Sequence, residues 1–208
     1  AQNNTVAGTG AGANFSGTDA NDNTLLGKDA GNDITTGDNN TAIGSGALDV
    51  NTTASNNTAV GHDSLGANTT GDLNTAIGTY AMGSCTNADR NVAVGYTALQ
   101  NIAADQGDTL HTCVGFRAGN AITTAIQQTH VGANAGLSVT TGHRCTFIGY
   151  SAGGATTTGS DNTAVGRTAL QANTTGYANT AVGSQTGDAI TTAWGCTLVG
   201  HAAGGAIT

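Results

Sequence analysis

A glycine that recurs with a period of 17 constrains the fold of this chain more than any other feature. It ends a phrase that reads NTAIG at residues 40–44 and NTAVG at residues 57–61 and 162–166. The glycine stands at positions 8, 27, 44, 61, 78, 95, 115, 132, 149, 166, 183 and 200, and every step between neighbours is 17 except the first (19) and the sixth (20). Twelve copies of one unit in a single chain indicate a repeat architecture.

A period of 17 is too short for a pair of helices with their turns, but it suits one coil of a β-solenoid, in which short strands pair from coil to coil. The chain has no Glu, one Lys and no Pro. Few strong helix formers argue against helices, and the absence of Pro fits a backbone whose N–H groups bond to the next coil. We therefore predict an all-β protein, a parallel β-solenoid (β-roll) of about twelve 17-residue coils that forms a single domain over residues 1–208.

Positions within the coil predict which side chains face inward. With the first residue of the phrase as offset 0, Asn occupies offset 0 in eight of twelve copies, Thr occupies offset 1 in eleven, and Ile, Val or Leu occupies offset 3 in eleven. Offsets 1 and 3 share one face of a strand, and the aliphatic character of offset 3 predicts that this face is the interior. The glycine at offset 4 is expected at a corner with positive φ, and the Asn column is expected to form a turn and a ladder of side-chain amides.

Two further positions are expected to fill the interior together. Offset 8 is Leu or Met in some copies and Gly in others, and where it is Gly, offset 11 is usually Ile, Val or Phe. Such an exchange is expected if the interior of every coil has the same small volume, because a large side chain is then needed at one of the two offsets and not at both. The sixth copy has Leu99 and Ile102 at the two offsets, and the ninth has Gly153 and Thr156. We therefore expect a swollen sixth coil and a thin ninth coil.

Charge and composition argue against several classes of protein. The net charge of −8 argues against binding to nucleic acid, which requires basic surfaces. No apolar run approaches the roughly 18–20 residues of a membrane span, so membrane insertion is not expected. The glycine-rich stretch GTGAG at residues 8–12 is not followed by a helix pattern and carries no cofactor prediction. The first residues, AQNNT, are typical of a mature secreted chain, so an extracellular or cell-surface location is expected.

No set of residues predicts catalysis or a metal site. The four cysteines include no C-x-x-C pair, and the five histidines occupy different offsets. Cys113, His130 and Phe147 replace the usual Ala at offset 2 in three successive copies. Cys113 and His130 are two potential ligands, and a metal site needs three or four, so we expect this column to face a locally different neighbouring element. The chain is not expected to be an enzyme.

Offset 5 is variable and is expected to point outward. Its aromatic and basic members, together with one residue at offset 6, are candidates for surface recognition: Tyr96, Phe116, Arg117, Tyr150 and Arg167. Such residues suit either binding of a cell-surface receptor or glycan, or contact between chains in an assembly. Thr recurs at offsets 12 and 13 and suggests ice binding, but adjacent offsets point to opposite faces, so only one Thr column is expected to be exposed.

The phrase NTAVGRTALQANTTGYANTAVG at residues 162–183 resembles the head repeats of trimeric autotransporter adhesins and repeats of bacterial and phage tail-fibre-type proteins. The resemblance covers the chain from Asn4 onward. It implies a left-handed β-roll that assembles as a trimer. By the same resemblance, the inward pairs would be Thr41 with Ile43 and Thr58 with Val60, and the corners would be Gly44 and Gly61.

The two ends of the chain suggest how copies could assemble. Ala1, Gln2 and Asn3 precede the first copy, and the last copy stops at Ile207 and Thr208, so tail and head together nearly complete a coil. An open coil exposes unpaired backbone groups that invite pairing with another chain. We therefore expect an extracellular structural protein that forms fibres by stacking on itself head to tail, with lateral contacts through the Ala columns at offsets 2 and 7. The alternatives are an adhesin or tail-fibre shaft that binds a receptor, and an ice-binding solenoid.

Overall fold

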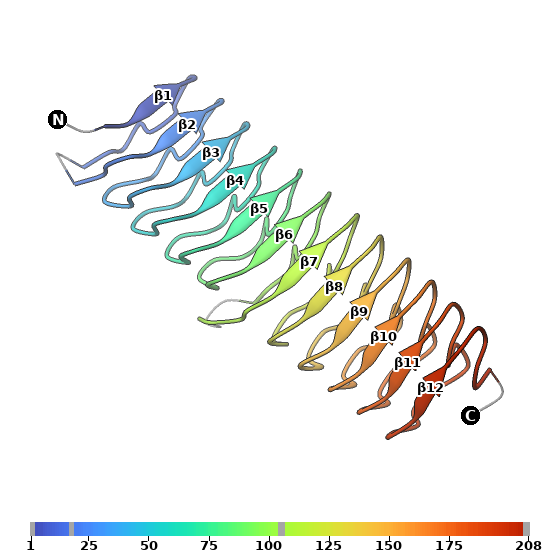
Figure 1. Ribbon diagram of the computed structural model, residues 1–208. Helices are drawn as coiled ribbons and strands as arrows, with labels where there is room; N and C mark the ends of the chain where they lie inside the picture. The colour runs from blue at the N-terminus through green and yellow to red at the C-terminus, as the bar shows by residue number, and fades with distance from the viewer. Residues whose placement is uncertain (1–2, 17–18, 104–106, 206–208) are drawn as a thin grey trace. The chain divides into compact units, whose positions relative to one another are not determined.

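The structure is a computed structural model that describes residues 3–16, 19–103 and 107–205. Regular secondary structure in these residues consists of twelve short strands (Figure 1). They are β1 Thr5–Ala7, β2 Thr24–Leu26, β3 Thr41–Ile43, β4 Thr58–Val60, β5 Thr75–Ile77, β6 Val92–Val94, β7 Thr112–Val114, β8 Thr129–Val131, β9 Thr146–Ile148, β10 Thr163–Val165, β11 Thr180–Val182 and β12 Thr197–Val199.

The strands pair in parallel and in the order of the sequence. The chain divides into two compact units, Ala1–Thr109 and Leu110–Thr208, and the boundary falls in the long sixth copy. β1–β6 follow one another in the first unit and β7–β12 in the second, with equivalent residues of successive copies side by side, as Thr41 is beside Thr58. The prediction of a parallel β-solenoid whose coils repeat with a period of 17 is confirmed.

The prediction of which strand residues face inward is wrong. From β2 to β11 the middle residue of each strand, at offset 2, is buried: Ala42 is fully buried, whereas Ile43 at offset 3 is 37% exposed and Thr41 at offset 1 is half-buried. Side chains do alternate between the two faces, but offsets 1 and 3 face outward and offset 2 faces inward. A short strand between two corners turns only its central side chain to the interior. The Ala columns at offsets 2 and 7 are buried, as Ala42 and Ala47 show, so they are not lateral contact surfaces.

The Asn ladder is confirmed, and it lies inside the coils. Oδ1 of Asn74 accepts a hydrogen bond from the backbone N–H of Asn91 in the next coil (3.0 Å), and Nδ2 donates to the carbonyl oxygen of Ala88 (2.8 Å). The same two bonds recur at Asn23, Asn40, Asn57, Asn162 and Asn179. Each side chain thus joins the turn of its own coil to the backbone of the next, and offset 0 shares the inward face with offset 2.

We expect the substitution Asn74→Ala to lower the free energy of unfolding by about 3 kcal/mol, because it leaves the buried N–H of Asn91 without its acceptor and Ala88 without the amide donor. Denaturant titration followed by circular dichroism measures the loss. Thr70→Ala is the matched control, since Thr70 is exposed in the same region of the first unit. Equal stability of the two variants would show that the ladder does not contribute.

The corner prediction for the glycine at offset 4 is also confirmed. All twelve of these glycines have φ between 122° and 140°. A Cβ built on Gly61 would lie 2.6 Å from the carbonyl carbon of Gly78, the corner glycine of the next coil. Stacked corners therefore leave no room for a side chain, in addition to requiring a backbone conformation that favours Gly.

Three sites, rather than two, fill the interior of each coil. The ninth coil is not thin, because Phe147 at offset 2 is fully buried there, and a Cβ on Gly153 would lie 2.5 Å from its ring. Where offset 2 is Ala, a buried Leu, Met or Ile at offset 8 or 11 supplies the volume. The sixth coil buries both Leu99 and Ile102, as the sequence indicates. The contribution of Phe147 was missed because its column was assigned to the outside.

Candidate interaction surface

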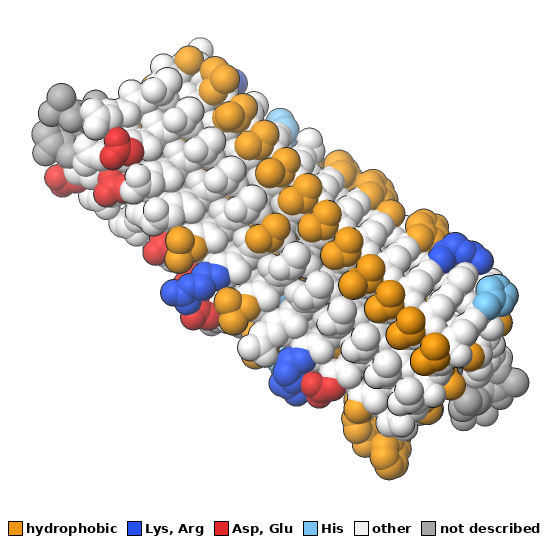
Figure 2. All heavy atoms as spheres, in the orientation of Figure 1, with side chains coloured by type: hydrophobic (Ala, Val, Ile, Leu, Met, Phe, Trp, Pro, Cys, Tyr) orange, Lys and Arg blue, Asp and Glu red, His pale blue; other side chains and the backbone are white. Residues whose placement is uncertain are grey.

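The outward side chains of the strands form a regular face in each unit. We call the residues at offsets 1 and 3 of the strands the strand face. Offset 1 contributes a column of Thr, and offset 3 contributes a column of aliphatic residues, among them Leu26 (51% exposed), Ile77 (39%) and Val199 (71%). Figure 2 shows the resulting row of hydrophobic side chains crossing the strands. Neighbouring members of a column are about 4.8 Å apart, the spacing of paired strands.

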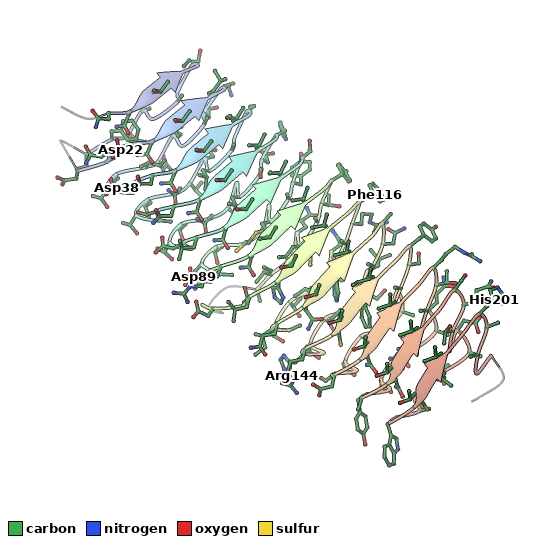
Figure 3. All side chains as sticks on the ribbon, viewed as in Figure 1. Asp22, Asp38, Asp89, Phe116, Arg144 and His201 are labelled. Carbon is green, nitrogen blue, oxygen red and sulfur yellow. The ribbon has the colours of Figure 1, made fainter. Side chains whose placement is uncertain are left out.

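Two lines of side chains border the strand face. The trailing rim consists of the residues at offset 5, just after the corner glycine. The leading rim consists of the residues at offset −1, just before the repeated phrase begins. Figure 3 shows Phe116 and His201 of the trailing rim on one side of the strands of the second unit, and Arg144 of the leading rim on the other side. Asp22 has the same place on the leading rim of the first unit, next to the start of β2.

Four of the five residues predicted for recognition lie on the trailing rim. Tyr96 is 50% exposed, Phe116 49% and Tyr150 56%, and Arg167 is exposed as well. Arg117 is exposed at the neighbouring offset 6. The predicted outward orientation is confirmed, but the residues do not converge on one site. Tyr96 belongs to the first unit, and the others lie on three coils of the second. Their role in recognition stays a prediction.

The leading rim carries exposed apolar residues that sequence reasoning missed. Leu73 (49% exposed, φ 60°) and Leu110 (45%, φ 56°) occupy a left-handed position that is Asn at residues 39 and 56. One position earlier, Tyr177 and Trp194 of adjacent coils stack in parallel with their ring centroids 5.8 Å apart. The available signal was a large apolar residue at a position that otherwise suits Asn or Asp.

Ion pairs hold several rim side chains in place. On the leading rim, Arg144 donates from Nε to Oδ1 of Asp161 (2.7 Å) and from Nη2 to Oδ2 (3.0 Å), and these bonds lower the pKa of the Asp161 carboxyl. On the trailing rim, Lys28 pairs with the next residue, Asp29, at 2.8 Å. Such exposed pairs contribute little to stability, so their main effect is to orient the side chains.

The column of Cys113, His130 and Phe147 faces the interior, which contradicts the predicted contact with a neighbouring element. All three side chains are fully buried, and the imidazole of His130 stacks on the ring of Phe147, with centroids 5.1 Å apart. Among the residues that the structure describes, no group of three or more His, Cys, Asp or Glu side chains is placed to hold a metal ion. Packing, rather than ligation, accounts for this column.

One tautomer of His130 follows from its neighbours. Gln128 donates from Nε2 to the carbonyl oxygens of Ile126 and Gly142, so its Oε1 is the acceptor for Nε2 of His130 at 3.1 Å. Nδ1 of His130 is buried and has no hydrogen-bond partner in the described part of the chain. Burial and repulsion from His111 lower the pKa of His130 to about 3, and burial lowers the pKa of His111 to about 4. Both imidazoles are therefore neutral in the folded unit.

Two other surface features are a hollow on the first unit and the Thr column at offset 13. An open hollow of about 430 Å³ lies on the first unit between Asp49, Asp63 and Tyr80. Burial and repulsion from nearby carboxylates raise the pKa of Asp49. Thr hydroxyls at offset 12 donate hydrogen bonds to the next coil, as Thr52 does to the carbonyl oxygen of Thr69 (3.1 Å). The exposed Thr column at offset 13 therefore has no second exposed Thr column directly beside it.

The predicted assembly ends are mostly outside the described residues: this applies to Ala1, Gln2, Ile207 and Thr208, whereas Asn3 is described and exposed. Within residues 3–16, 19–103 and 107–205, no helix has the length and apolar character that crossing a membrane requires. Comparison with protein-family models gives no match to this chain, and neither curated proteins nor solved structures give one.

Proposed function

We propose that this protein is an extracellular structural protein whose copies associate through the strand face to build fibres. The observation that carries the proposal is the outward column of Leu, Ile and Val residues at offset 3, which runs over β2–β6 in the first unit and over β7–β12 in the second. An apolar surface that is repeated in this way favours a partner with the same repeat. A second copy of this chain presents the same residues at the same spacing.

An estimate of buried area supports association over many coils. If each aliphatic residue loses roughly 50 Å² of exposed surface, six strands bury on the order of 300 Å², or about 7 kcal/mol at roughly 25 cal/mol per Å². Association costs about 4–15 kcal/mol in lost freedom. Contact through the strand face of one unit is therefore of the same order as the cost of association.

Stacking along the coil direction is a second part of the proposal. Every described junction within a unit uses the same register, and most use the same Asn bonds, so the backbone of one coil matches that of another. A free strand edge of a coil pairs readily with a chain of matching backbone. Lateral contact combined with stacking would give fibres with more than one chain in cross-section.

Placing charge on the strand face is expected to abolish association. We expect Val131→Asp combined with Val165→Asp to give a folded monomer, because carboxylates would be buried without partners at the contact. Sedimentation velocity over a range of concentrations measures the change. Thr141→Asp with Thr158→Asp is the matched control, since both residues are exposed away from the strand face in the same unit. A wild-type protein that stays monomeric at high concentration would contradict the proposal.

An adhesin or fibre shaft that binds a receptor is the second candidate, because Tyr150 and Phe116 expose about half of their surface on the trailing rim. Substituting both with Ser, the residue at offset 5 of the third and eleventh copies, separates the two functions. An adhesin would lose binding to its target cell or glycan array and keep its assembly. A purely structural protein would show no binding to lose.

A further inference from the structure

The hollow on the first unit lies where two successive coils lack a side chain. At offset 9, the third and sixth coils carry Asp49 and Gln100, whereas the fourth and fifth coils between them carry Gly66 and Gly83. These are the only two successive copies that have Gly at this offset. The hollow therefore runs along the stacking direction from Asp49 to Gln100, which are three coil spacings, or about 14 Å, apart.

The backbone does not require the two glycines. Neither has a positive φ, and the atoms nearest to a Cβ on either of them would be carbonyl oxygens 3.2 Å away. The same turn accommodates an acidic residue in the third coil, where the N–H of Asp49 donates to the carbonyl oxygen of Gly46 (3.3 Å). The fold therefore does not account for the missing side chains.

Two carboxylates lie at one end of the hollow. A Cβ on Gly46 would be 2.1 Å from Oδ1 of Asp63, so the Asp63 side chain rests on the first residue of the turn that Asp49 closes. Burial and repulsion from three nearby carboxylates, Asp63 among them, raise the pKa of the Asp49 carboxyl. Negative charge is thus concentrated at this end, while the amide of Gln100 leaves the other end uncharged.

The charge of Asp49 is not compensated within the first unit. Among the described residues, no donor forms a hydrogen bond with its carboxylate, and no cationic side chain lines the hollow. Lys28, the cation whose charge acts on Asp49, is paired with Asp29 at 2.8 Å. A concave surface that carries charge of one sign attracts ligands of the opposite sign.

The side wall of the hollow places an aromatic ring next to a carboxylate. Nδ1 of His62 is 3.1 Å from Oδ2 of Asp63, and the His62 ring meets the ring of Tyr80 edge on, with centroids 5.3 Å apart. His62 thereby holds both wall residues in place, and Oδ1 of Asp63 is left on the side of Gly46. An organic cation is attracted both by a carboxylate and by the face of a Tyr ring.

We propose that this hollow binds an organic cation, namely an ammonium or guanidinium group at the end of an aliphatic chain. The charged group lies between Asp49 and Asp63, and the aliphatic chain lies over Gly66 and Gly83 beside the Tyr80 ring. The volume of about 430 Å³ is in the range of ligand pockets, and a bare metal ion would leave most of it empty. The site is separate from the strand face and does not depend on association of copies.

Titration with a charged peptide and its neutral counterpart tests the site. The probe is the tripeptide Gly-Arg-Gly with blocked ends, and its control has citrulline, which is similar in shape but uncharged, in place of Arg. Amide NMR signals of Gly66 and Gly83 report binding at low salt, where screening is weak. We expect both signals to shift with the Arg peptide at millimolar concentration and to stay in place with the citrulline peptide.

Removing the charge at the end of the hollow is expected to weaken binding. Asp49→Asn keeps the shape of the side chain, and we expect about a fivefold loss of affinity, the upper range for an ion pair that is not fully buried. Asp188→Asn is the matched control, because Asp188 is half-buried at the same offset in the second unit. Its affinity should equal that of the wild type.

Filling the hollow is expected to abolish binding. Gly66→Gln with Gly83→Gln introduces the residue that the sixth coil has at this offset, and the signals of Ala67 and Ser84 then report binding. Gly154→Gln is the control at the same offset of the second unit. Circular dichroism shows whether each variant is folded, and Asp49→Asn keeps the test decisive if the filled variant is not.

Agmatine, in which the same guanidinium ends a free alkylamine chain, identifies the source of the cation. Tighter binding of the Arg peptide assigns the hollow to a side chain of a peptide or protein, whereas comparable or tighter binding of agmatine assigns it to a free amine. Both results support the proposal. Equal shifts with the citrulline peptide, unchanged affinity of Asp49→Asn, or no binding of either cation at low salt would overturn it.

Discussion

Replacement of Gly61 by Ala is expected to destabilise the first unit by on the order of 4 kcal/mol or more, enough to unfold a marginal domain. Gly61 has φ 134°, and its added Cβ would lie 2.6 Å from the carbonyl carbon of Gly78 and 3.0 Å from the backbone nitrogen of Thr79. These contacts are with backbone, which cannot move aside without breaking the register of two coils. Denaturant titration and thermal unfolding of the purified variant measure the loss.

Gly200→Ala is the matched control for this effect. Gly200 occupies the same offset with φ 122°, but a Cβ there meets no atom within 4 Å. We expect only the cost of the unfavourable backbone conformation, roughly 1–3 kcal/mol. If the two variants lose equal stability, the clash between stacked corners does not explain the invariant glycine.

Acid is expected to destabilise the second unit through its two buried imidazoles. The pKa values of His130 and His111 are about 3 and about 4, below the ordinary value of 6.5 that holds in the unfolded chain. Between these values the unfolded state binds more protons, so the free energy of unfolding falls as the pH drops from about 6.5. At pH 4 the loss is about 3 kcal/mol for each residue, by the scale of roughly 1.36 kcal/mol per pKa unit.

Variants that copy other coils test this assignment. His111→Asn restores the usual ladder residue, and His130→Ala with Gly136→Leu restores the Ala and Leu combination of Ala164 and Leu170 in the same unit. We expect the combined variant to keep its unfolding free energy between pH 7 and pH 5, where the wild type loses part of it. Urea titrations at each pH measure both. Parallel pH curves for the two proteins would show that other groups cause the acid sensitivity.

The sequence was sufficient for those parts of the fold that depend on local geometry. The period of 17 identified the solenoid, the invariant glycine identified the corner, and the Asn at offset 0 identified the ladder. The orientation of the strands was predicted wrongly, because aliphatic residues at offset 3 were assumed to be core. The buried Asn at offset 0 is the clue that would have corrected it, since offsets 0 and 2 share a face and Ala42 must then point inward with Asn40.

The candidate surface was predictable only in part. The variable, aromatic offset 5 led directly to Tyr96, Phe116 and Tyr150. The leading rim was not recognised, because its residues precede the repeated phrase and look like ordinary turn residues. That Leu110 and Phe116 border one face also depends on which side of the strand is outward, and this was known only from the structure.

The interior columns change together rather than one at a time. His111, Gln128 and Cys145 replace the ladder Asn in the same three successive coils in which Cys113, His130 and Phe147 replace the strand Ala. These side chains pack against those of adjoining coils, as His130 stacks on Phe147. These three coils therefore form one packing group, and a coil with the usual Asn and Ala in place of the middle one would lose its fit to both neighbours.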